Sequence, residues 1–374
     1  MITKRLLDVC DFQGGTQPPK EEWINAPREG YVRMLQIRDY SQGDAKFIQY
    51  VKDTKKLHKC KKDDIMLSRY GYIGQAFMGL EGAYNVALVK VIKKEEIHTP
   101  YLLYYFQSYY FQHFLLSNVG ARATIPGFNK DELENALIRL PEISEQVEIA
   151  SKIAKVDELI GYHKQQLDIL DTLIKSRFIE MFVTTNDVDY WAQTTIADVS
   201  TDMRTGPFGS ALHHDEFVDS GVFVLGIDNA VENKFSYNRM RYITEEKYRQ
   251  LKRYTVYPGD VIITIMGTVG RSAVIPKDMP KAINTKHLAC ITPNTALIDS
   301  TFLSSAFQMH PSIRLQLQNQ CKGAIMDGLN LTIIKALRFA LPPMDLQLQF
   351  AAFVEQTDKS KYHGESTYET EMAA

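Results

Sequence analysis

The feature of this sequence that most constrains its fold is an internal duplication. KKDDIMLSRYGYIGQAF (61–77) aligns with YPGDVIITIMGTVGRSAV (257–274), and its Asp and two glycines recur 196 positions later: Asp64 on Asp260, Gly71 on Gly267, Gly74 on Gly270. GYVRMLQIRD (30–39) aligns upstream with GVFVLGID (221–228). Downstream the offset drifts to 201, where Asn129, Leu140, Pro141 and Gln146 fall on Asn330, Leu341, Pro342 and Gln347. Constant order with a drifting offset indicates a duplicated domain with small loop insertions.

Each repeat reads as a mixture of α and β structure. Short β-rich runs such as VRMLQI, DDIMLS and VFVLGI are separated by glycines and polar turns. One helical stretch is predicted after each set, PYLLYYFQSYYFQHFLLS at 100–117 and STFLSSAFQMHPSIRLQLQ at 300–318. We therefore predict an α+β fold with two similar mixed domains in tandem, each with its own core.

A different element lies between the repeats, in residues 141–183. From Ile149 onward, residues recur at spacings of four and three and predict one packed face of a long coiled-coil-type helix. The apolar members of this seam are Ile149, Ile153, Val156, Ile160, Leu167, Leu170, Ile174 and Met181, interrupted by His163 and Arg177. About 40 residues at 1.5 Å each predict a rod of roughly 60 Å. Its apolar seam requires a packing partner.

The same start of a helix recurs after the second repeat. Phe350 and Val354 occupy seam positions there, and the register then reaches Thr357 and Lys361. The predicted organisation is one repeat at 1–140, the long helix at 141–183, the second repeat at 184–340, the start of a second helix at 341–361, and a disordered tail at 362–374.

Composition narrows the functional classes. No apolar stretch approaches the roughly 20 residues that span a bilayer, and the N-terminus lacks a signal-peptide core, so we expect a cytoplasmic protein. The four cysteines are far apart and never form Cys-x-x-Cys, which disfavours a zinc site or a disulfide framework. No metal site is expected, and the cysteines are expected to be buried or inert thiols.

Charge alternates along the chain. The formal net charge is −2, but Lys plus Arg exceed Asp plus Glu by four in residues 1–140 and by four in 200–340. Residues 141–199 carry a net −6 and residues 341–374 a net −4. Two basic repeats are compatible with a polyanionic partner, although solvated faces alone can produce imbalances of this size.

Two similar domains, each followed by Leu-Pro-x-x-x-x-x-Gln and a long helix, resemble the specificity subunit of type I restriction–modification systems. LPEISEQVEIASKIAKVDELI, LPPMDLQLQFAAFVEQTD, the opening FQGGTQPPKEEW at 12–23 and the Gly-x-x-Gly elements carry this resemblance. It implies that each repeat is a target recognition domain for one half of a split DNA sequence. It also implies that the two helices pack antiparallel and set the gap between the half-sites.

The resemblance further implies partners. They are double-stranded DNA, modification (methyltransferase) subunits and restriction/translocase subunits, and S-adenosylmethionine, ATP and Mg are expected in those subunits rather than in this chain. Members of this family are expected to continue the second helix for several turns beyond Lys361. The second helix is therefore expected to be truncated, and a second copy of this chain is a further expected partner that could cover the central seam.

Two alternatives are open. A DNA methyltransferase needs an Asn/Asp-Pro-Pro-Tyr/Phe element, but the Pro-Pro pairs here follow Gln17 and Leu341; no Walker lysine or nuclease set is present either. No catalytic residue is predicted, and GTVGR is interpreted as a structural turn rather than a phosphate loop. A scaffold that binds only protein is the other alternative, which the salt dependence of DNA affinity would distinguish.

Candidate DNA contacts are the polar and basic residues near the loops of each repeat. In the first repeat they are Gln17, Lys20, Arg69, Tyr70 and Arg122; in the second they are Arg204, Ser210, Arg271, Lys286, His287 and Lys322. Arginine can donate two hydrogen bonds to guanine, whereas lysine more often contacts phosphate.

Overall fold

The computed structural model describes residues 2–43, 47–119, 127–208, 211–321 and 329–373, with the side chains of 320–321 and 362–373 left undescribed. The chain divides into two compact units, Met1–Leu159 and Ile160–Ala374, and the boundary falls inside one long helix. The central helix therefore contributes residues to both units.

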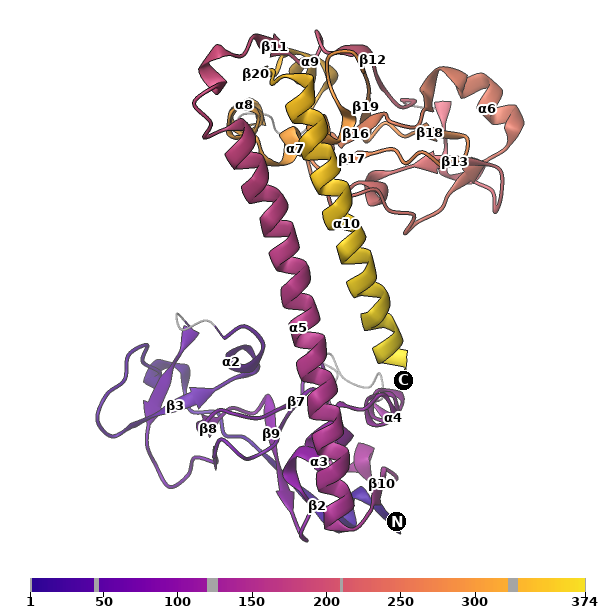
Figure 1. The fold of residues 1–374 in the computed structure, drawn as a ribbon. Helices are drawn as coiled ribbons and strands as arrows, with labels where there is room; N and C mark the ends of the chain where they lie inside the picture. Colours follow the sequence, from indigo (N-terminus) through magenta and orange to yellow (C-terminus); the bar gives the residue numbers. More distant parts are fainter. Residues whose placement is uncertain (1, 44–46, 120–126, 209–210, 322–328, 374) are drawn as a thin grey trace. The chain divides into compact units, whose positions relative to one another are not determined.

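Unit 1 contains ten strands among its described residues (Figure 1): β1 (Ile2–Arg5), β2 (Cys10–Gly14), β3 (Tyr31–Leu35), β4 (Tyr50–Lys52), β5 (Lys59–Cys60), β6 (Met66–Ser68), β7 (Ala76–Phe77), β8 (Gly82–Tyr84), β9 (Leu88–Lys93) and β10 (Leu137–Leu140). Its helices are α1 (Leu6–Val9), α2 (Ile37–Ser41), α3 (Thr99–Gln107), α4 (Tyr109–Asn118) and the first part of α5 (Ile143–Phe182), with short 3-10 turns at Lys20–Glu22 and Asp131–Leu133.

Unit 2 repeats this order. Its strands are β11 (Gln193–Thr195), β12 (Ser200–Thr205), β13 (Val222–Leu225), β14 (Tyr242–Ile243), β15 (Thr255–Val256), β16 (Val261–Thr264), β17 (Ser272–Val274), β18 (Ala282–Asn284), β19 (Leu288–Pro293) and β20 (Arg338–Ala340). After the end of α5 its helices are α6 (Glu245–Leu251), α7 (Ser300–Met309), α8 (Pro311–Cys321), α9 (Leu331–Ala336) and α10 (Met344–Ala373), with 3-10 turns at Val188–Tyr190, His214–Glu216, Ile227–Asn229 and Lys252–Tyr254.

The sheets of the two units have the same topology. Each unit has a two-stranded sheet, β1-β10 or β11-β20, and an antiparallel sheet, β2-β9-β6-β7 or β12-β19-β16-β17. Each also has a mixed sheet, β4-β3-β8-β5 or β14-β13-β18-β15, in which β3 runs parallel to β8 and β13 parallel to β18. Even the register agrees, since Ser68 lies opposite Leu88 and Thr264 opposite Leu288. The predicted duplication of an α+β domain is confirmed.

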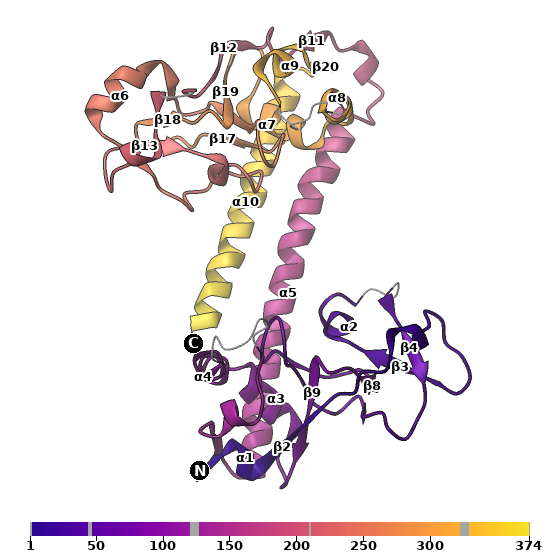
Figure 2. The ribbon, with the colours of Figure 1, turned by 180° about the vertical axis from the view of Figure 1, so that it is seen from behind.

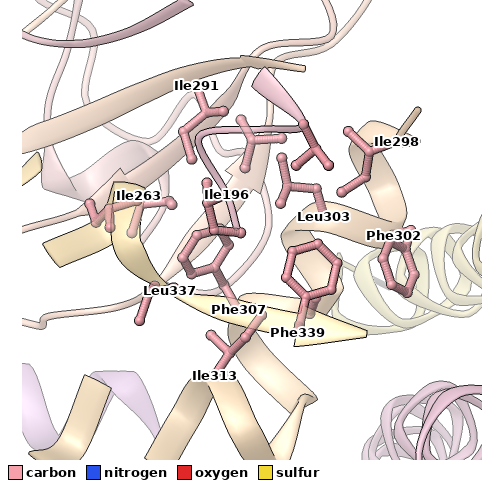
Figure 3. Packing of buried hydrophobic residues seen from close by; sticks show 14 of the residues in the cluster. Ile196, Ile263, Ile291, Ile298, Phe302, Leu303, Phe307, Ile313, Leu337 and Phe339 are labelled. Atoms are coloured by element: carbon pink, nitrogen blue, oxygen red, sulfur yellow. The ribbon is translucent and has the colours of Figure 1, made fainter. Parts of the chain in front are cut away.

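The core of unit 2 lies between the antiparallel sheet and the helices that follow it. Figure 3 shows Phe302 and Phe307 of α7 beside Phe339 of β20, with Ile263 and Ile291 of the sheet nearby. These side chains are buried, and the sheet contributes β-branched residues because they pack well on a pleated surface. Unit 1 has an equivalent core around Phe12, Phe106 and Phe111.

Each predicted helical stretch is broken into two helices. α3 and α4 are separated by Ser108, whose extended backbone (ψ 147°) stops the first helix and whose hydroxyl accepts a hydrogen bond from Phe111 N. In unit 2 the break lies at His310, which precedes Pro311. A residue before proline is biased away from the helical region, so this second break has a local cause.

The long central helix is confirmed as α5, 40 residues long. In the part of α5 that belongs to unit 2, Ile174 is buried, while Ile160, Leu167, Leu170 and Met181 are half-buried. Toward its start Ile149 is half-buried, but Ile153 and Val156 are exposed. Phe178 and Phe182, which flank the predicted seam, are fully buried, because Phe302 and Phe350 contact both rings.

The second helix, α10, packs beside the end of α5 within unit 2 (Figures 1 and 2). Its predicted seam is confirmed, since Phe350 and Thr357 are buried and Val354 is half-buried. Lys361 keeps only 12% of its side chain exposed and forms an ion pair with Asp171 of α5. Helical backbone continues to Ala373, beyond the end predicted at Lys361 and in place of the disordered tail predicted for 362–374.

The repeated Leu-Pro-x-x-x-x-x-Gln motif anchors each of these helices to its unit. Gln146 accepts a hydrogen bond from His98 N at 3.0 Å and donates one to Pro141 O at 2.9 Å. Gln347 accepts from Asp299 N at 2.9 Å and donates to Pro342 O at 2.8 Å. Both glutamines are buried, so each satisfies backbone groups that water does not reach.

Candidate nucleic-acid interface

The Gly-x-x-Gly elements form one kind of turn in both units. All four glycines have positive φ, between 71° and 82° at Gly71, Gly74, Gly267 and Gly270, a region that residues with a Cβ avoid. A hydroxyl at the strand end closes each turn. Ser68 Oγ accepts from Gln75 N and donates to Tyr72 O, and Thr264 Oγ1 makes the same bonds with Arg271 N and Thr268 O.

The turns use their own backbone N–H groups. Gly74 N donates to Ser68 O at 2.8 Å, and Gly270 N donates to Thr264 O at 2.9 Å. A phosphate loop instead directs successive free N–H groups at the ligand. The interpretation of GTVGR as a structural turn is therefore supported by its hydrogen bonds.

A second pair of glycines corresponds between the units, although sequence alignment did not reveal it. A Cβ on Gly15 would lie 2.4 Å from Tyr84 O, and one on Gly206 would lie 2.3 Å from Asn284 O. Only glycine permits this approach of the chain to the strand end at β8 or β18. The segment after Gly15 carries Gln17 and Lys20, which are both exposed.

A network of polar side chains lies at the edge of the mixed sheet in unit 1. Gln49 Oε1 accepts hydrogen bonds from Arg38 at 2.7 Å and from Gln36 Nε2 at 3.2 Å, and Gln49 Nε2 donates to Asn25 Oδ1 at 3.1 Å. Arg38 also lies over the Phe47 ring, 5.2 Å from its centroid. Asn25 is exposed and the other three hydrogen-bonded residues are half-buried. We call Asn25, Gln36, Arg38 and Gln49 the amide–arginine network.

The corresponding edge of unit 2 is charged. Arg241 forms an ion pair with Asp228, and their side chains are 21% and 39% exposed. Lys286 and His287 lie between β18 and β19, and burial, together with the positive charges of Lys286 and Arg241, lowers the pKa of His287. The imidazole therefore loses its proton more readily beside these two cations, and in its neutral form it can both donate and accept hydrogen bonds.

The predicted DNA contacts have different positions. Gln17, Lys20, Arg271 and Lys286 are exposed, and His287 is half-buried. Arg69 is half-buried, and it donates to Phe128 O at 3.1 Å and to Asn129 Oδ1. Tyr70 forms an isolated bridge with Gly127. Arg122, Ser210 and Lys322 lie outside the described residues.

Arg204 lies inside unit 2, contrary to its assignment as a DNA contact. Its side chain is 11% exposed and donates to Asp260 at 2.6 Å, to Thr255 O at 2.6 Å and to Thr292 Oγ1 at 2.9 Å. Asp260 is itself buried, so the guanidinium compensates a carboxylate that has lost its water. We reassign Arg204 to the domain framework.

Sequence reasoning missed the amide–arginine network and the Asp228–Arg241 pair. Arg38 and Gln49 are 11 positions apart, and Asp228 and Arg241 are 13 positions apart. The upstream alignment of residues 30–39 with 221–228 contained the signal that could have found Arg38 and Asp228.

In the part of the chain that the structure describes, no group of three or more His, Cys, Asp or Glu side chains is arranged to hold a metal ion. Cys10, Cys60 and Cys290 are buried thiols, and the side chain of Cys321 is not described. Among the described helices, none combines the length and apolarity that a membrane crossing requires.

Comparison with known families decides the identity of the two units. The family described as "Type I restriction modification DNA specificity domain" matches residues 1–171 and 209–367, one match in each repeat. The chain belongs to this family. It carries two type I DNA specificity domains in tandem.

Relatives and solved structures agree with this membership. The chain is 23% identical to the type I restriction enzyme MjaVIII specificity subunit of Methanocaldococcus jannaschii, covering 95% of this chain and 85% of the relative. It is 22% identical to the EcoBI specificity subunit of Escherichia coli, covering 93% and 77%.

Two solved structures share the fold. The type I restriction–modification S subunit from M. genitalium matches with a TM-score of 0.56 at 13% identity, covering 100% of this chain and 93% of that one. A chain from a structural study of complex assembly in the type I R-M system matches with a TM-score of 0.60 at 15% identity, covering 100% and 94%. Specificity domains of this family can therefore keep one fold at very low sequence identity.

Proposed function

We propose that this chain selects the DNA sequence on which a type I restriction–modification complex acts. Each unit reads one half of a bipartite target in double-stranded DNA, and the helices α5 and α10 set the gap between the half-sites. The observation that carries this proposal is the repetition of one framework with different exposed side chains. Two copies of one framework suit two half-sites of different sequence, since base contacts specify a sequence whereas backbone contacts only position the protein.

The chain is proposed to be non-catalytic. Its sequence lacks the Asn/Asp-Pro-Pro-Tyr/Phe element that holds a flipped adenine, and its Gly-x-x-Gly turns consume their own N–H groups. The chemistry is assigned to partners: modification subunits that use S-adenosylmethionine, and restriction/translocase subunits that use ATP and Mg. Association with a second copy of this chain is a further prediction, which sedimentation velocity of the purified chain would test.

Co-expression with the modification subunit of the same system tests the reading function. Methylated adenines in the host DNA would be mapped by sequencing. The expected result is one split motif with a constant gap, present only when both proteins are expressed. A continuous motif, or methylation that does not depend on this chain, would contradict the proposal.

A second assay addresses catalysis. The purified chain is incubated with S-adenosylmethionine and DNA, with and without the modification subunit. No methyl transfer is expected from the chain alone, and transfer is expected when the modification subunit is added. Transfer by the chain alone would favour the methyltransferase alternative.

A further inference from the structure

We propose that one pair of corresponding positions, Arg38 with Gln49 in unit 1 and Asp228 with Arg241 in unit 2, reads a base pair in each half-site. This inference rests on the proposed function, because it assigns specificity within domains that are proposed to bind DNA. It names the residues that determine which DNA sequence is recognised, and the side-chain chemistry by which each unit recognises a base.

The correspondence of the two pairs follows from strand register. Tyr50 lies opposite Arg33 in unit 1, and Tyr242 lies opposite Phe223 in unit 2, at the same place in the two sheets. Gln49 and Arg241 are the residues immediately before these tyrosines. Gln49 lies next to the end of β3, the strand that leads to Arg38. Arg241 lies next to the end of β13, the strand that leads to Asp228.

The partner positions correspond as well. Leu35 lies opposite Tyr84 and Leu225 opposite Asn284, so the last residues of β3 and β13 are equivalent. Arg38 and Asp228 each follow that residue by three positions. In both units the side chain at this position contacts the side chain at the other, as a hydrogen bond at 2.7 Å in unit 1 and as an ion pair in unit 2.

The framework beneath the pairs is retained while the pairs differ. Asp39 Oδ2 accepts from Gln36 N at 2.9 Å, and Asn229 Oδ1 accepts from Gly226 N at 2.8 Å, so the same short turn is capped in the same way. The Asp39 and Asn229 side chains are buried. The hydrogen bond of the cap is retained, whereas the partly exposed pair changes from an arginine–amide hydrogen bond to an aspartate–arginine ion pair. A change of side-chain chemistry at a partly exposed position on a retained turn is what two different half-sites require.

The side chains at these positions are those that distinguish bases. Arginine donates two hydrogen bonds to guanine, glutamine and asparagine pair with adenine, and aspartate accepts from the amino group of cytosine. Gln36 and Asn25 extend the pair in unit 1 with further amides, and the Gln49 side chain, fixed by three hydrogen bonds, is held ready for contact. Such a pre-formed surface loses little side-chain entropy on binding.

Exposed lysines of the two units suit another role. Lys286 in unit 2 and Lys20 in unit 1 are exposed. A flexible ammonium group is suited to phosphate contact, which adds affinity without sequence information. The proposal therefore separates base-reading pairs from phosphate-contacting lysines.

The test uses the assembled complex of this chain with its modification subunit. Once the methylated motif is known, affinities are measured for a panel of duplexes in which each base pair of the two half-sites is replaced in turn. Gln49→Ala is compared with Gln42→Ala, an exposed glutamine close to α2 and outside the network. Gln49→Ala is expected to reduce discrimination at one position of the first half-site by on the order of 5- to 150-fold, with the second half-site unchanged. Gln42→Ala should match the wild-type chain.

Three results would overturn the inference while leaving the proposed function intact. They are discrimination unchanged at all positions, an equal loss of affinity for every duplex, and the same change in Gln42→Ala. If Gln49→Ala fails to fold, Gln49→Glu, which keeps the side-chain size and the acceptor for Arg38, is judged by the same criteria. A wild-type complex that shows no split motif would instead refute the proposed function.

A variant in which unit 1 carries the pair of unit 2 should gain a new base preference. Arg38→Asp together with Gln49→Arg transfers the unit 2 pair into unit 1. The preferred base at one position of the first half-site should change to the base that the unit 2 pair reads, with the gap and the second half-site retained. A methylated motif identical to that of the wild-type chain would contradict the assignment.

Discussion

Asp64 and Asp260 occupy corresponding positions, yet their cationic partners come from different strands. Lys90 of β9 pairs with Asp64 at 3.3 Å, whereas Arg204 of β12 pairs with Asp260 at 2.6 Å. Gln13 takes the place of Arg204 in unit 1, because it lies opposite Lys90 just as Arg204 lies opposite Cys290. The corresponding carboxylates, half-buried at Asp64 and buried at Asp260, are thus neutralised from two different neighbouring strands.

Arg204→Gln should destabilise unit 2 by about 3–5 kcal/mol, because it leaves the Asp260 carboxylate buried without a counter-charge. Adding Cys290→Lys re-creates the unit 1 arrangement and should recover part of the loss. Urea unfolding measures the stability of both variants. It is carried out in a Trp23→Phe background, where Trp191 in unit 2 is the only tryptophan and reports on that unit.

Arg271→Gln is the matched control, since it removes an exposed arginine of the same unit and should change stability by less than about 0.5 kcal/mol. A double variant, Arg204→Gln with Cys290→Lys, that is no more stable than Arg204→Gln would show that a lysine on β19 does not replace the arginine on β12 as the partner of Asp260.

His310 should make the stability of unit 2 depend on pH. It is 8% exposed between the rings of Phe178 and Phe339, and burial lowers its pKa below the ordinary value. The unfolded chain therefore binds the proton more readily, so stability is fully present above the unfolded pKa of about 6.5 and is lost as pH falls below it. Urea unfolding between pH 7.5 and pH 5.5 should show this loss, and His310→Phe should reduce it. If the free energy of unfolding of His310→Phe changed with pH as steeply as that of the wild-type chain, His310 would be excluded as the cause.

At the scale of elements, the repeated glutamine contributes more to the stability of its unit than its sequence context suggests. Gln347→Ala should destabilise unit 2 by roughly 1–3 kcal/mol, because Asp299 N and Pro342 O lose their partner in a buried place. Gln349→Ala, two residues away and exposed, is the control and should be close to neutral. Equal effects of the two substitutions in urea unfolding would show that the motif does not anchor the helix.

The elements that sequence could predict are those defined by periodicity or repetition. The seam from Ile149 to Met181 predicted α5, and the repeated Asp-to-Gly spacing predicted two domains with the same topology. The burial of Phe178 and Phe182 could not be predicted, since it depends on Phe302 and Phe350 from distant segments.

The candidate site was less accessible to prediction for the same reason. An arginine near a turn looks like a surface cation in sequence, and only strand pairing shows that Arg204 lies against Asp260. The partnership of Arg38 with Gln49 depends on β3 and β4 lying side by side, which is a tertiary fact. Glycine conformation, by contrast, is local, so the turns at Gly71 and Gly267 were predictable.

At the scale of the whole molecule, a chain with net charge −2 is proposed to bind a polyanion. A negative net charge is compatible with DNA binding here because the charge is unevenly distributed: the repeats are net positive and the helical segments are net negative. Exposed lysines occur in both units, including Lys20 in unit 1 and Lys286 in unit 2. Local rather than total charge then governs contact with phosphate.

The salt dependence of DNA affinity should therefore be steep, with the logarithm of the binding constant falling by about 0.9 per neutralised phosphate for each tenfold rise in salt. Lys20→Gln and Lys286→Gln should each make the slope shallower by about 1 without altering sequence preference, and their effects should add because they lie in different units. Lys359→Gln is the control, since this lysine of α10 is paired with Glu355. Titrations of the assembled complex at several salt concentrations measure the slopes. A wild-type slope near zero would favour the protein-binding scaffold, because docking to protein does not release the counterions of DNA.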